Sequence, residues 1–500
     1  MYQHGSYSKE APTSLRGMVT AKNPIFVVGT APINMGDLSN VNKAQLVTSA
    51  EEAMKYFGGT ADLDFTISEV LDACLNLYNV KPIVAVNVLD PKKHKTQHEE
   101  AGLIPILNKA TLEKKGIILE TVTVKIPEQQ SNLPSEKYHT YFDKTGAVIV
   151  EIIGEGIPKI DVAYSFLDIS KVTKLDIIGG IDPNSLKKEG FECIDEVFNK
   201  YSMIPGLIIA PGFSHEEEVK AIIEAKSTSI NSKFGAMGII DLPDGIQYGE
   251  AIQKKKELNI IDEDLILCYG RGKLGDKVYN LSTLVAGLAS SVDAQNDGVP
   301  YESPSNKNLK VSALVIKNIS QLASKAGDIL PLALNQDFTY DEVLLDEEQQ
   351  ANILNENGIV TAIRRSNGFV LWGNRTAAFQ PGGSTDVKDI WIPVKRMFKY
   401  VSNTILLNTA QDVDRPMTYS RAELIQNTIN VYLNGLTSAQ KLLGGRIEFL
   451  REENPIGDML EGKFKWHIYL GAVLPGESLH FTFEYDPTYQ EVFVERIAAA

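Results

Sequence analysis

The sequence predicts an α/β protein in which a mostly parallel sheet with flanking helices carries an inserted β-rich domain. An α+β C-terminal domain with antiparallel strands and extended terminal arms completes the predicted fold. Apolar strand-like runs alternate with helical periods over residues 24–89 and 191–291, which is typical of a parallel sheet covered on both faces. Residues 92–185 lack this alternation, and the C-terminal region holds strands with strict apolar–polar alternation.

The composition limits the class of protein. A chain of 500 residues corresponds to roughly three domains, and 43% hydrophobic with 23% charged residues is typical of soluble globular proteins. The net charge of −15 argues against a surface that grips phosphate backbones. No apolar run approaches the ~18 residues of a membrane helix, and the N-terminus lacks the apolar region of a secretory signal. Cys74, Cys193 and Cys268 lie far apart and are predicted to be reduced core thiols.

The first α/β part is predicted over residues 23–91. Residues 24–32 form a buried-type strand that ends in a turn, a helical period follows the capping box that starts at Thr66, and residues 82–89 form a second strand. Residues 1–22 are polar and aperiodic, so we expect an extended N-terminal arm.

Residues 92–185 are predicted to be a separate β-rich insertion that begins with a charged linker. His94 and His98 are spaced to bind a metal if helical, but no acid or thiol is placed beside them, so a solvated segment is favoured. The α/β pattern then continues over residues 186–345. Its expected strands are 206–210, 233–240 and 265–269, and its expected helices are 217–225, 248–257 and 281–291.

The C-terminal domain is predicted over residues 346–485. It opens with a hairpin of residues 359–363 and 369–372 around Asn367-Gly368, because both turn residues tolerate positive φ. Helices are expected over 387–406 and after Ser420. Strands 464–470 and 479–485 are predicted to pair through the turn at Pro475-Gly476, with edges left open for another strand. The residues expected on the pairing strands are Phe464, Trp466, Ile468, Leu479, Phe481 and Phe483. Residues 486–500 are predicted to be a polar, aperiodic C-terminal arm.

The segment around the first hairpin resembles the signature of the contractile phage tail sheath family, which includes the sheaths of R-type bacteriocins. The matching residues are Asn355, Gly358, Ile359, Ile363, Gly368, Trp372, Gly373, Arg375 and Thr376. Residues 26–32, with Gly29, also resemble the family's opening strand. Residues 297–307 are similar to a loop of the family, except that Pro300 stands where tryptophan is usual.

The resemblance implies a structural subunit and not an enzyme. Copies would polymerise as stacked rings around an inner tube, stay linked by strand exchange, and contract to drive the tube through a cell envelope. The implied partners are further copies of the chain, an inner tail tube protein, and baseplate and terminator proteins. No cofactor, nucleic acid or membrane contact is implied. The insertion would face outward, the C-terminal domain would face the tube, and assembly would occur in the bacterial cytoplasm before the tail or particle is released.

One alternative function comes from a local motif. Residues 270–275 match G-x-G-x-x-G, so an NAD(P)-dependent oxidoreductase that uses Gly270, Gly272 and Gly275 is the second hypothesis. Asp293, at the expected distance, does not end an apolar strand, which argues against a dinucleotide site.

Lys395, Arg396 and Lys399 lie on the predicted helix over 387–406. Lys395 and Lys399 share one helix face, which is either a solvated basic face or an electrostatic contact with an acidic inner tube. The sequence leaves both hypotheses open.

Overall fold

The computed structural model describes residues 18–127, 131–154, 157–317, 339–383 and 386–499. An eight-stranded sheet lies at its centre, in the order β2-β3-β1-β13-β14-β15-β20-β21. Strands β3 to β20 run parallel, and the edge strands β2 and β21 are antiparallel to their neighbours. In sequence order these strands are β1 (Ile25–Gly29), β2 (Gln45–Val47), β3 (Ile83–Asn87), β13 (Leu207–Ile209), β14 (Met237–Asp241), β15 (Leu265–Cys268), β20 (Ile359–Arg365) and β21 (Gly368–Trp372).

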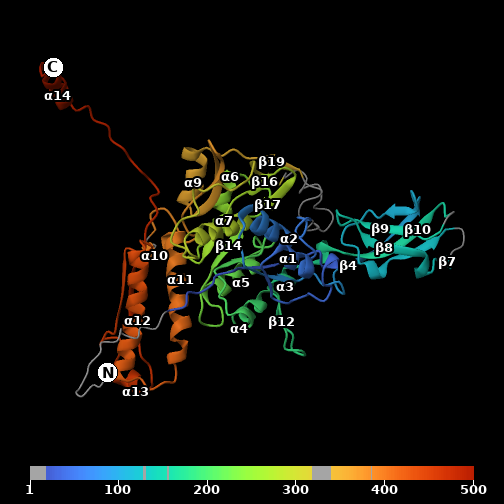
Figure 1. Cartoon of the computed structure of the whole chain (residues 1–500), viewed down its shortest axis with the longest axis horizontal. Coiled ribbons are helices and arrows are strands. Elements are labelled where there is room, and N and C mark those ends of the chain that lie inside the picture. The colour runs from blue at the N-terminus through green and yellow to red at the C-terminus, as the bar shows by residue number, and fades with distance from the viewer. Residues whose placement is uncertain (1–17, 128–130, 155–156, 318–338, 384–385, 500) are drawn as a thin grey trace, which may run out of the picture.

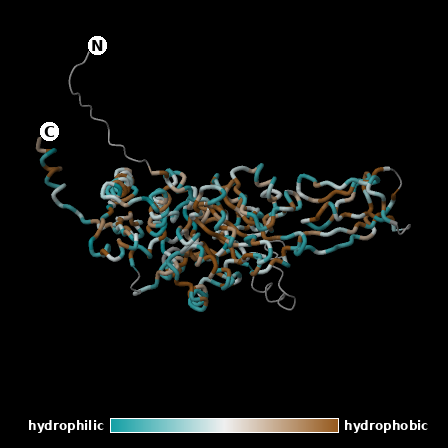
Figure 2. The backbone as a smooth tube through the Cα atoms, turned by 90° about the horizontal axis from the view of Figure 1, so that it is seen from below, coloured by the Kyte–Doolittle hydropathy of each residue, from teal (hydrophilic) through white to brown (hydrophobic). Residues whose placement is uncertain are grey.

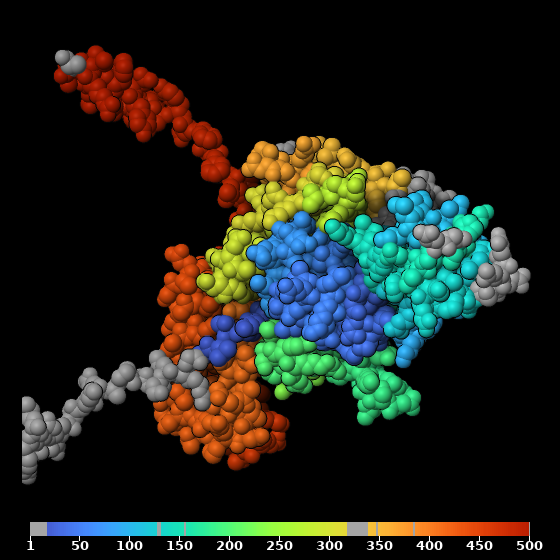
Figure 3. Space-filling model, turned by 45° about the vertical axis from the view of Figure 1, so that its right-hand side comes forward, coloured from blue at the N-terminus to red at the C-terminus, as the bar shows by residue number. Residues whose placement is uncertain are grey.

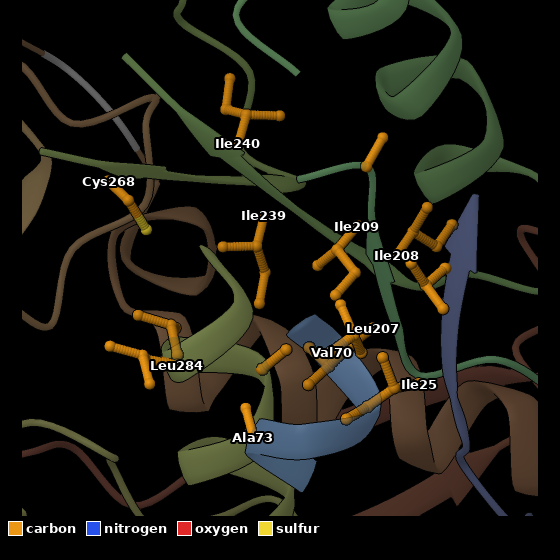
Figure 4. Packing of buried hydrophobic residues seen from close by; sticks show 14 of the residues in the cluster. Ile25, Val70, Ala73, Leu207, Ile208, Ile209, Ile239, Ile240, Cys268 and Leu284 are labelled. Atoms are coloured by element: carbon orange, nitrogen blue, oxygen red, sulfur yellow. The ribbon is translucent and has the colours of Figure 1, made fainter. Parts of the chain in front are cut away.

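Helices cover both faces of this sheet. Every residue of β1, β3, β14 and β15 is buried, as expected for strands that contact helices on both sides. Figure 4 shows Ile239 and Leu207 on the side of Val70 and Leu284, and Ile240 and Ile208 toward the other face. Val70 belongs to α2 (Thr66–Leu71) and Leu284 to α7 (Leu281–Gln295), whereas α5 (Glu217–Thr228) packs on the opposite face. The predicted mixed α/β fold with a large, mostly parallel sheet is confirmed at this level.

The predicted hairpin of β20 and β21 exists, but it belongs to the central sheet. Leu267 pairs with Ile359 and Cys268 with Val360, so β20 extends the parallel part of the sheet. The predicted start of the C-terminal domain at residue 346 is therefore wrong, because this hairpin belongs to the central sheet. The apolar run that starts at Ile359 is buried on both faces, which fits a central strand better than a half-exposed hairpin.

The glycine motif of residues 270–275 does not form a dinucleotide loop. It forms a hairpin of β16 (Arg271–Leu274) and β17 (Lys277–Asn280), and helix α7 begins only after β17. A Cβ atom on Gly272 would lie 2.3 Å from Cδ1 of Leu284, so packed side chains already occupy the space that a cofactor would need. The oxidoreductase hypothesis has no support. The hairpin continues into β18 (Ala313–Lys317) and β19 (Tyr340–Glu342), giving the sheet order β17-β16-β18-β19.

Residues 95–167 form a β-rich unit that projects from the central sheet (Figure 1). One sheet has the order β4-β10-β6-β7 and a second has the order β5-β9-β8. The strands are β4 (Lys95–Leu103), β5 (Lys109–Thr111), β6 (Thr123–Ile126), β7 (Ser131–Asn132), β8 (Tyr138–Phe142), β9 (Val148–Ile152) and β10 (Ile160–Leu167). Their apolar residues form a core cluster separate from that of the central sheet.

The predicted charged linker at the start of this unit is wrong, because most of it is strand β4. His94 is buried and not solvated: its Nδ1 accepts the backbone N–H of Asp90 at 3.0 Å, and its Nε2 lies 3.4 Å from the Asp176 carboxylate. Among the described residues, no three His, Cys, Asp or Glu side chains gather as metal ligands.

The C-terminal unit pairs α11 (Ile392–Thr409) with α12 (Tyr419–Ser438) over a shared apolar core. A single helix over 387–406 is wrong: α10 (Val387–Ile390) ends before Trp391, and Pro393 lies in the first turn of α11, where its missing N–H is tolerated. The remaining α-helices and strands of the described residues are α1 (Ala50–Phe57), α3 (Lys174–Ile178), β11 (Gly180–Ile181), β12 (Lys188–Glu189), α4 (Val197–Tyr201), α6 (Tyr248–Glu257), α9 (Asn352–Glu356), β22 (Gly444–Glu448), α13 (Ile456–Leu460), β23 (His467–Gly471) and α14 (Thr488–Ala498).

Hydrophobic positions concentrate in the middle of the molecule, as Figure 2 shows. The three cysteines are buried there as free thiols, as predicted. No helix in the described part of the chain is both long enough and apolar enough to cross a membrane.

Candidate assembly surface

Strands β22 and β23 form a two-stranded antiparallel sheet on the C-terminal unit. Gly444 pairs with Gly471 and Glu448 with His467. In the described ranges each strand has one neighbour only, so each leaves one edge without a partner. A two-stranded sheet is marginally stable alone and an unpaired edge is a template for another strand.

An apolar groove of about 820 Å³ lies beside β23. Its walls are the end of α11, the loop over residues 412–417, the start of α12, and the side chains of Phe464, Trp466 and Ile468. The Nε1 of Trp466 is buried and has no acceptor among the described residues, while the ring of Phe449 packs 5.5 Å from the Trp466 ring. The groove therefore has an apolar floor and an unsatisfied donor in one wall.

Residues 472–499, named here the C-terminal arm, leave the C-terminal unit and stand clear of it (Figures 1 and 3). Leu479, Phe481 and Phe483 alternate along this arm, and their exposed fractions are 74%, 77% and 94%. Large apolar side chains rarely remain so exposed unless a partner covers them. The arm therefore carries an amphipathic strand sequence without a strand partner in the described chain.

Two sequence predictions about this region are wrong. Residues 464–470 and 479–485 do not pair, because β22 takes the place beside β23. Residues 486–500 are not an aperiodic segment, because Thr488–Ala498 forms helix α14. Of the six pairing-strand candidates, Phe464, Trp466 and Ile468 line the groove, and Leu479, Phe481 and Phe483 lie on the arm.

The root of the arm is held by Arg375, a residue of the sheath-family signature. Its Nε lies 3.1 Å from both carboxylate oxygens of Glu477. The guanidinium group also stacks on Phe379 at 3.9 Å and approaches Trp391 at 5.4 Å. Cation–π contact and a two-pronged ion pair together fix where the arm leaves the body.

The other signature residues serve close backbone packing. Gly358 has φ +66°, and a Cβ there would lie 2.4 Å from the carbonyl oxygen of Thr376. Gly373 has φ +137°, which side chains rarely adopt, and Trp372 donates from Nε1 to Asn352 at 3.0 Å. A Cβ on Gly29, far along the sheet, would lie 2.1 Å from Thr66 Oγ1. Gly358 and Gly373 therefore shape the fold beside the arm root, and Gly29 shapes another part of the central sheet.

We expect Arg375→Gln to loosen the arm root without unfolding the protein. The variant loses the ion pair with Glu477 and the stacking charge, contacts worth about 1–2 kcal/mol in partly buried sites. Hydrogen exchange of the amides at 472–478 should accelerate, while the melting temperature should fall only slightly. Lys463→Gln, which breaks an exposed pair with Glu461, is the control; equal exchange in both variants would contradict an anchoring role.

The three basic residues of α11 do not form a tube-facing surface. Lys399 Nζ lies 2.7 Å from Asp264, Lys395 Nζ lies 3.4 Å from the same carboxylate, and Arg396 Nη1 donates to Asp293 at 3.1 Å. Arg396 is only 6% exposed. The predicted contact of these residues with an inner tube is therefore wrong, because each side chain joins α11 to the α/β part of the chain.

Buried charges also gather at the carboxyl ends of the central strands, where α/β sheets commonly bind ligands. Arg271 donates to Asp244 at 2.7 and 2.9 Å, and Lys317 Nζ lies 2.9 Å from the same group. Burial opposes the ionisation of Asp244, but Arg271 and Lys317 outweigh it and lower its pKa. The cavity here measures about 20 Å³, room for about one water molecule. The cluster is therefore filled by its own side chains.

Glu69, in the same cluster, makes the stability pH-dependent. Burial raises the pKa of Glu69 to about 7, although Asn280 donates to the carboxylate from its backbone and side chain. The unfolded value is about 4, so the folded state keeps a proton that the unfolded state loses between these values. This contribution is fully present below about pH 4 and is lost as pH rises through about 7.

The free energy of unfolding should decline between pH 5 and pH 8 in the parent protein, and Glu69 should contribute up to about 3 kcal/mol of that decline. We expect Glu69→Gln to remove this contribution. Urea denaturation at both pH values measures the change. Glu257→Gln on the exposed face of α6 is the control, and the same slope in both variants would rule out this origin of the pH dependence.

The geometry defines a class before any comparison: a chain that carries an open sheet edge, an apolar groove and an exposed strand sequence. The sequence matches no protein-family model. It is 26% identical to the tail sheath protein of Burkholderia phage BcepMu, over 92% of each chain. It is 23% identical to a putative prophage major tail sheath protein of Pseudomonas aeruginosa, over 62% of this chain and 72% of the relative.

Solved structures show the same fold. The sheath complex of the extracellular contractile injection system PVC, in its contracted state, aligns with a TM-score of 0.56 and 13% identity, over 98% of this chain and 99% of that one. A chain of the anti-feeding prophage baseplate aligns with a TM-score of 0.54 and 16% identity, over 97% and 99%. The predicted resemblance to the contractile tail sheath family is confirmed.

Proposed function

We propose that this chain is the sheath subunit of a contractile tail or a related contractile particle. Its copies polymerise around an inner tube and shorten to drive that tube through a cell envelope. One observation carries the proposal: the open β22–β23 sheet and the exposed strand sequence at 479–485 belong to the same chain and have no partner within it in the described ranges. The similarity to tail sheath proteins supports the same role.

Strand exchange explains how such copies link. A strand added to an open edge satisfies a row of backbone donors and acceptors at once. Each hydrogen bond contributes about 0.5–1.5 kcal/mol net, so a few per neighbour give a firm but jointed connection. Donor and acceptor surfaces differ, so the contact is head-to-tail and builds rings or helices.

The proposed role is structural and needs neither fuel nor a catalytic residue, because the energy of contraction is stored in the packing of subunits. The partners we propose are further copies, an inner tube protein, and baseplate and terminator proteins. We also propose that the β-rich unit of residues 95–167 faces outward, since it projects away from the C-terminal unit that carries the open sheet (Figure 1). Assembly in the bacterial cytoplasm would precede release of the particle.

Electron microscopy and sedimentation at rising protein concentration test the proposal. We expect sleeves or rings of regular width from the full chain, longer when an inner tube protein is present. A chain that stays monomeric at every concentration, with or without a tube, would refute the proposal. NAD(H) titration, followed by fluorescence, should show no binding.

A further inference from the structure

The C-terminal helix α14 carries an apolar stripe that nothing in the described chain covers. Tyr489, Phe493 and Ile497 follow one another at intervals of four, which places them on one helix face. Each is more than half exposed. The helix has 11 residues, and isolated helices shorter than about 12–15 residues are marginal in water, so α14 needs a surface to stabilise it.

A second uncovered apolar stripe lies on α13, the helix that precedes β23 in the chain. Ile456 and Leu460 are also four residues apart, with exposed fractions of 73% and 83%. This helix is fixed at the start of β23: Lys465 donates its backbone N–H to Asn454 at 2.8 Å, and the Asn454 side chain donates back to the Lys465 carbonyl at 2.9 Å. The α13 stripe therefore flanks the first residues of β23.

Charge decides the direction in which an exchanged strand runs along β23. Two outward basic side chains lie at the start of β23: His467, its first residue, is 41% exposed, and Lys465, two residues before it, is 56% exposed. The outward acids of the arm, Glu484 and Asp486, lie at its C-terminal end. Antiparallel pairing brings the acids to the basic end of β23, whereas parallel pairing would bring His480 there instead. Lys465 and His467 each contact one acid of their own chain, but a lysine ammonium carries further donors.

The same direction aligns the apolar faces. With Glu484 opposite His467, the inward side chains Tyr485 and Phe483 lie opposite Trp466 and Ile468, at the wall of the apolar groove. Aromatic side chains then fill the groove.

We propose that the exchanged strand of a second copy runs antiparallel to β23, and that its α14 then docks on the α13 stripe of the receiving copy. This inference rests on the proposed strand exchange. In this register Pro487 lies beside Phe464, and α14 begins at the next residue, so no long linker is needed to reach Ile456 and Leu460. Each link then consists of a strand and a helix, both supplied by the same arm.

Paired cysteines test the direction of the strand in assembled full-length protein. Under oxidation, E484C with H467C should give a ladder of covalently linked chains, because these positions are opposite each other in the antiparallel register. H480C with H467C is the matched pair for the parallel register and should not form a ladder. The natural cysteines are buried and give no background.

A second pair tests the helix. L460C with F493C should also form the ladder, whereas L460C with E495C, on the opposite face of α14, should not. Phe493→Asp should raise the concentration needed for polymerisation by at least about tenfold, since it removes a buried aromatic contact. Ala498→Asp places the same charge on the other side of α14 and should have little effect.

Any other result of these experiments contradicts a specific part of the proposal. A ladder from the parallel pair contradicts the direction, and a strand ladder without the helix ladder contradicts the docking of α14; in both cases the proposed function stands. A crosslink confined to single chains means that the arm closes on its own β23. Phe493-dependent binding of the polymer to phosphatidylglycerol vesicles assigns α14 to lipid. Absence of any polymer overturns the inference together with the proposed function.

Discussion

A chain that ends at Ser478 should stay folded and should not polymerise. The deletion removes the strand sequence at 479–485 and helix α14, whose side chains are exposed and contribute nothing to the folded core. It retains Glu477, so Arg375 keeps its partner and the arm root keeps its position. The melting temperature should therefore remain that of the full chain.

The loss of assembly should be complete in practice. The exchanged strand supplies several backbone hydrogen bonds of about 0.5–1.5 kcal/mol each. Burying Leu479, Phe481 and Phe483 adds about 1.5–3 kcal/mol per side chain before the cost of association. A loss of about 4–5 kcal/mol of binding free energy lowers the affinity by about a thousandfold or more.

Sedimentation and electron microscopy measure this effect, and point variants of the full chain provide the control. Phe481→Asp combined with Phe483→Asp should reproduce the deletion, whereas Thr482→Asp, on the outward face of the same strand, should assemble nearly as well as the parent. Normal sleeves from the truncated chain would exclude the arm as the link.

Local patterns predicted the central fold well because each strand and helix carries its own period. The runs at Ile25–Gly29, Met237–Asp241 and Leu265–Cys268 are buried throughout and mostly apolar, as expected for strands covered on both faces. The pairing of β22 was missed for the opposite reason. Gly444–Glu448 contains one buried apolar residue, Ile447, and two glycines that resemble a helix end.

The alternation at 479–485 identified a strand sequence but could not identify its partner. The sequence predicted that residues 479–485 pair with residues 464–470 across the turn at Pro475-Gly476. In the structure, residues 479–485 instead extend away without a strand partner among the described residues. Helix α14 was missed although Tyr489, Phe493 and Ile497 show a period of four. Three apolar residues at intervals of four are a weak indication of a helix when the sequence does not show what surface they pack against.

The basic residues of α11 illustrate a different limit of sequence reasoning. The sequence shows that Lys395 and Lys399 share a face, but their acidic partner Asp264 lies more than a hundred residues earlier. Only the tertiary structure shows that this face is internal.

Arg396→Met should destabilise the protein by about 3–5 kcal/mol at neutral pH, because it leaves Asp293 buried without its partner. Arg396 joins α11 to the end of α7, and both side chains are shielded from solvent. Thermal and urea denaturation measure the loss. Lys463→Met, which breaks an exposed ion pair with Glu461, is the control and should cost less than about 1 kcal/mol.

The pH dependence and a double variant identify the cause of this loss. Burial raises the pKa of Asp293, and Arg396 opposes that rise. Without Arg396 the folded-state pKa rises further, so the destabilisation should be largest at neutral pH and shrink as pH falls toward about 4, where the unfolded carboxyl also becomes protonated. Arg396→Met combined with Asp293→Leu should recover most of the stability, because apolar replacement of a buried pair is often neutral or stabilising.

The sequence left a solvated basic face and a contact with the inner tube open for Arg396, and this result separates both from the internal contact with Asp293. A residue on a free tube-facing surface would tolerate the change with an unaltered melting temperature and would lose only attachment to the tube. A residue that joins α11 to α7 loses stability in the isolated subunit, before any tube is present, and regains it with the second substitution. A variant of unchanged stability at pH 7 would therefore contradict the role that the Arg396–Asp293 contact assigns to this side chain.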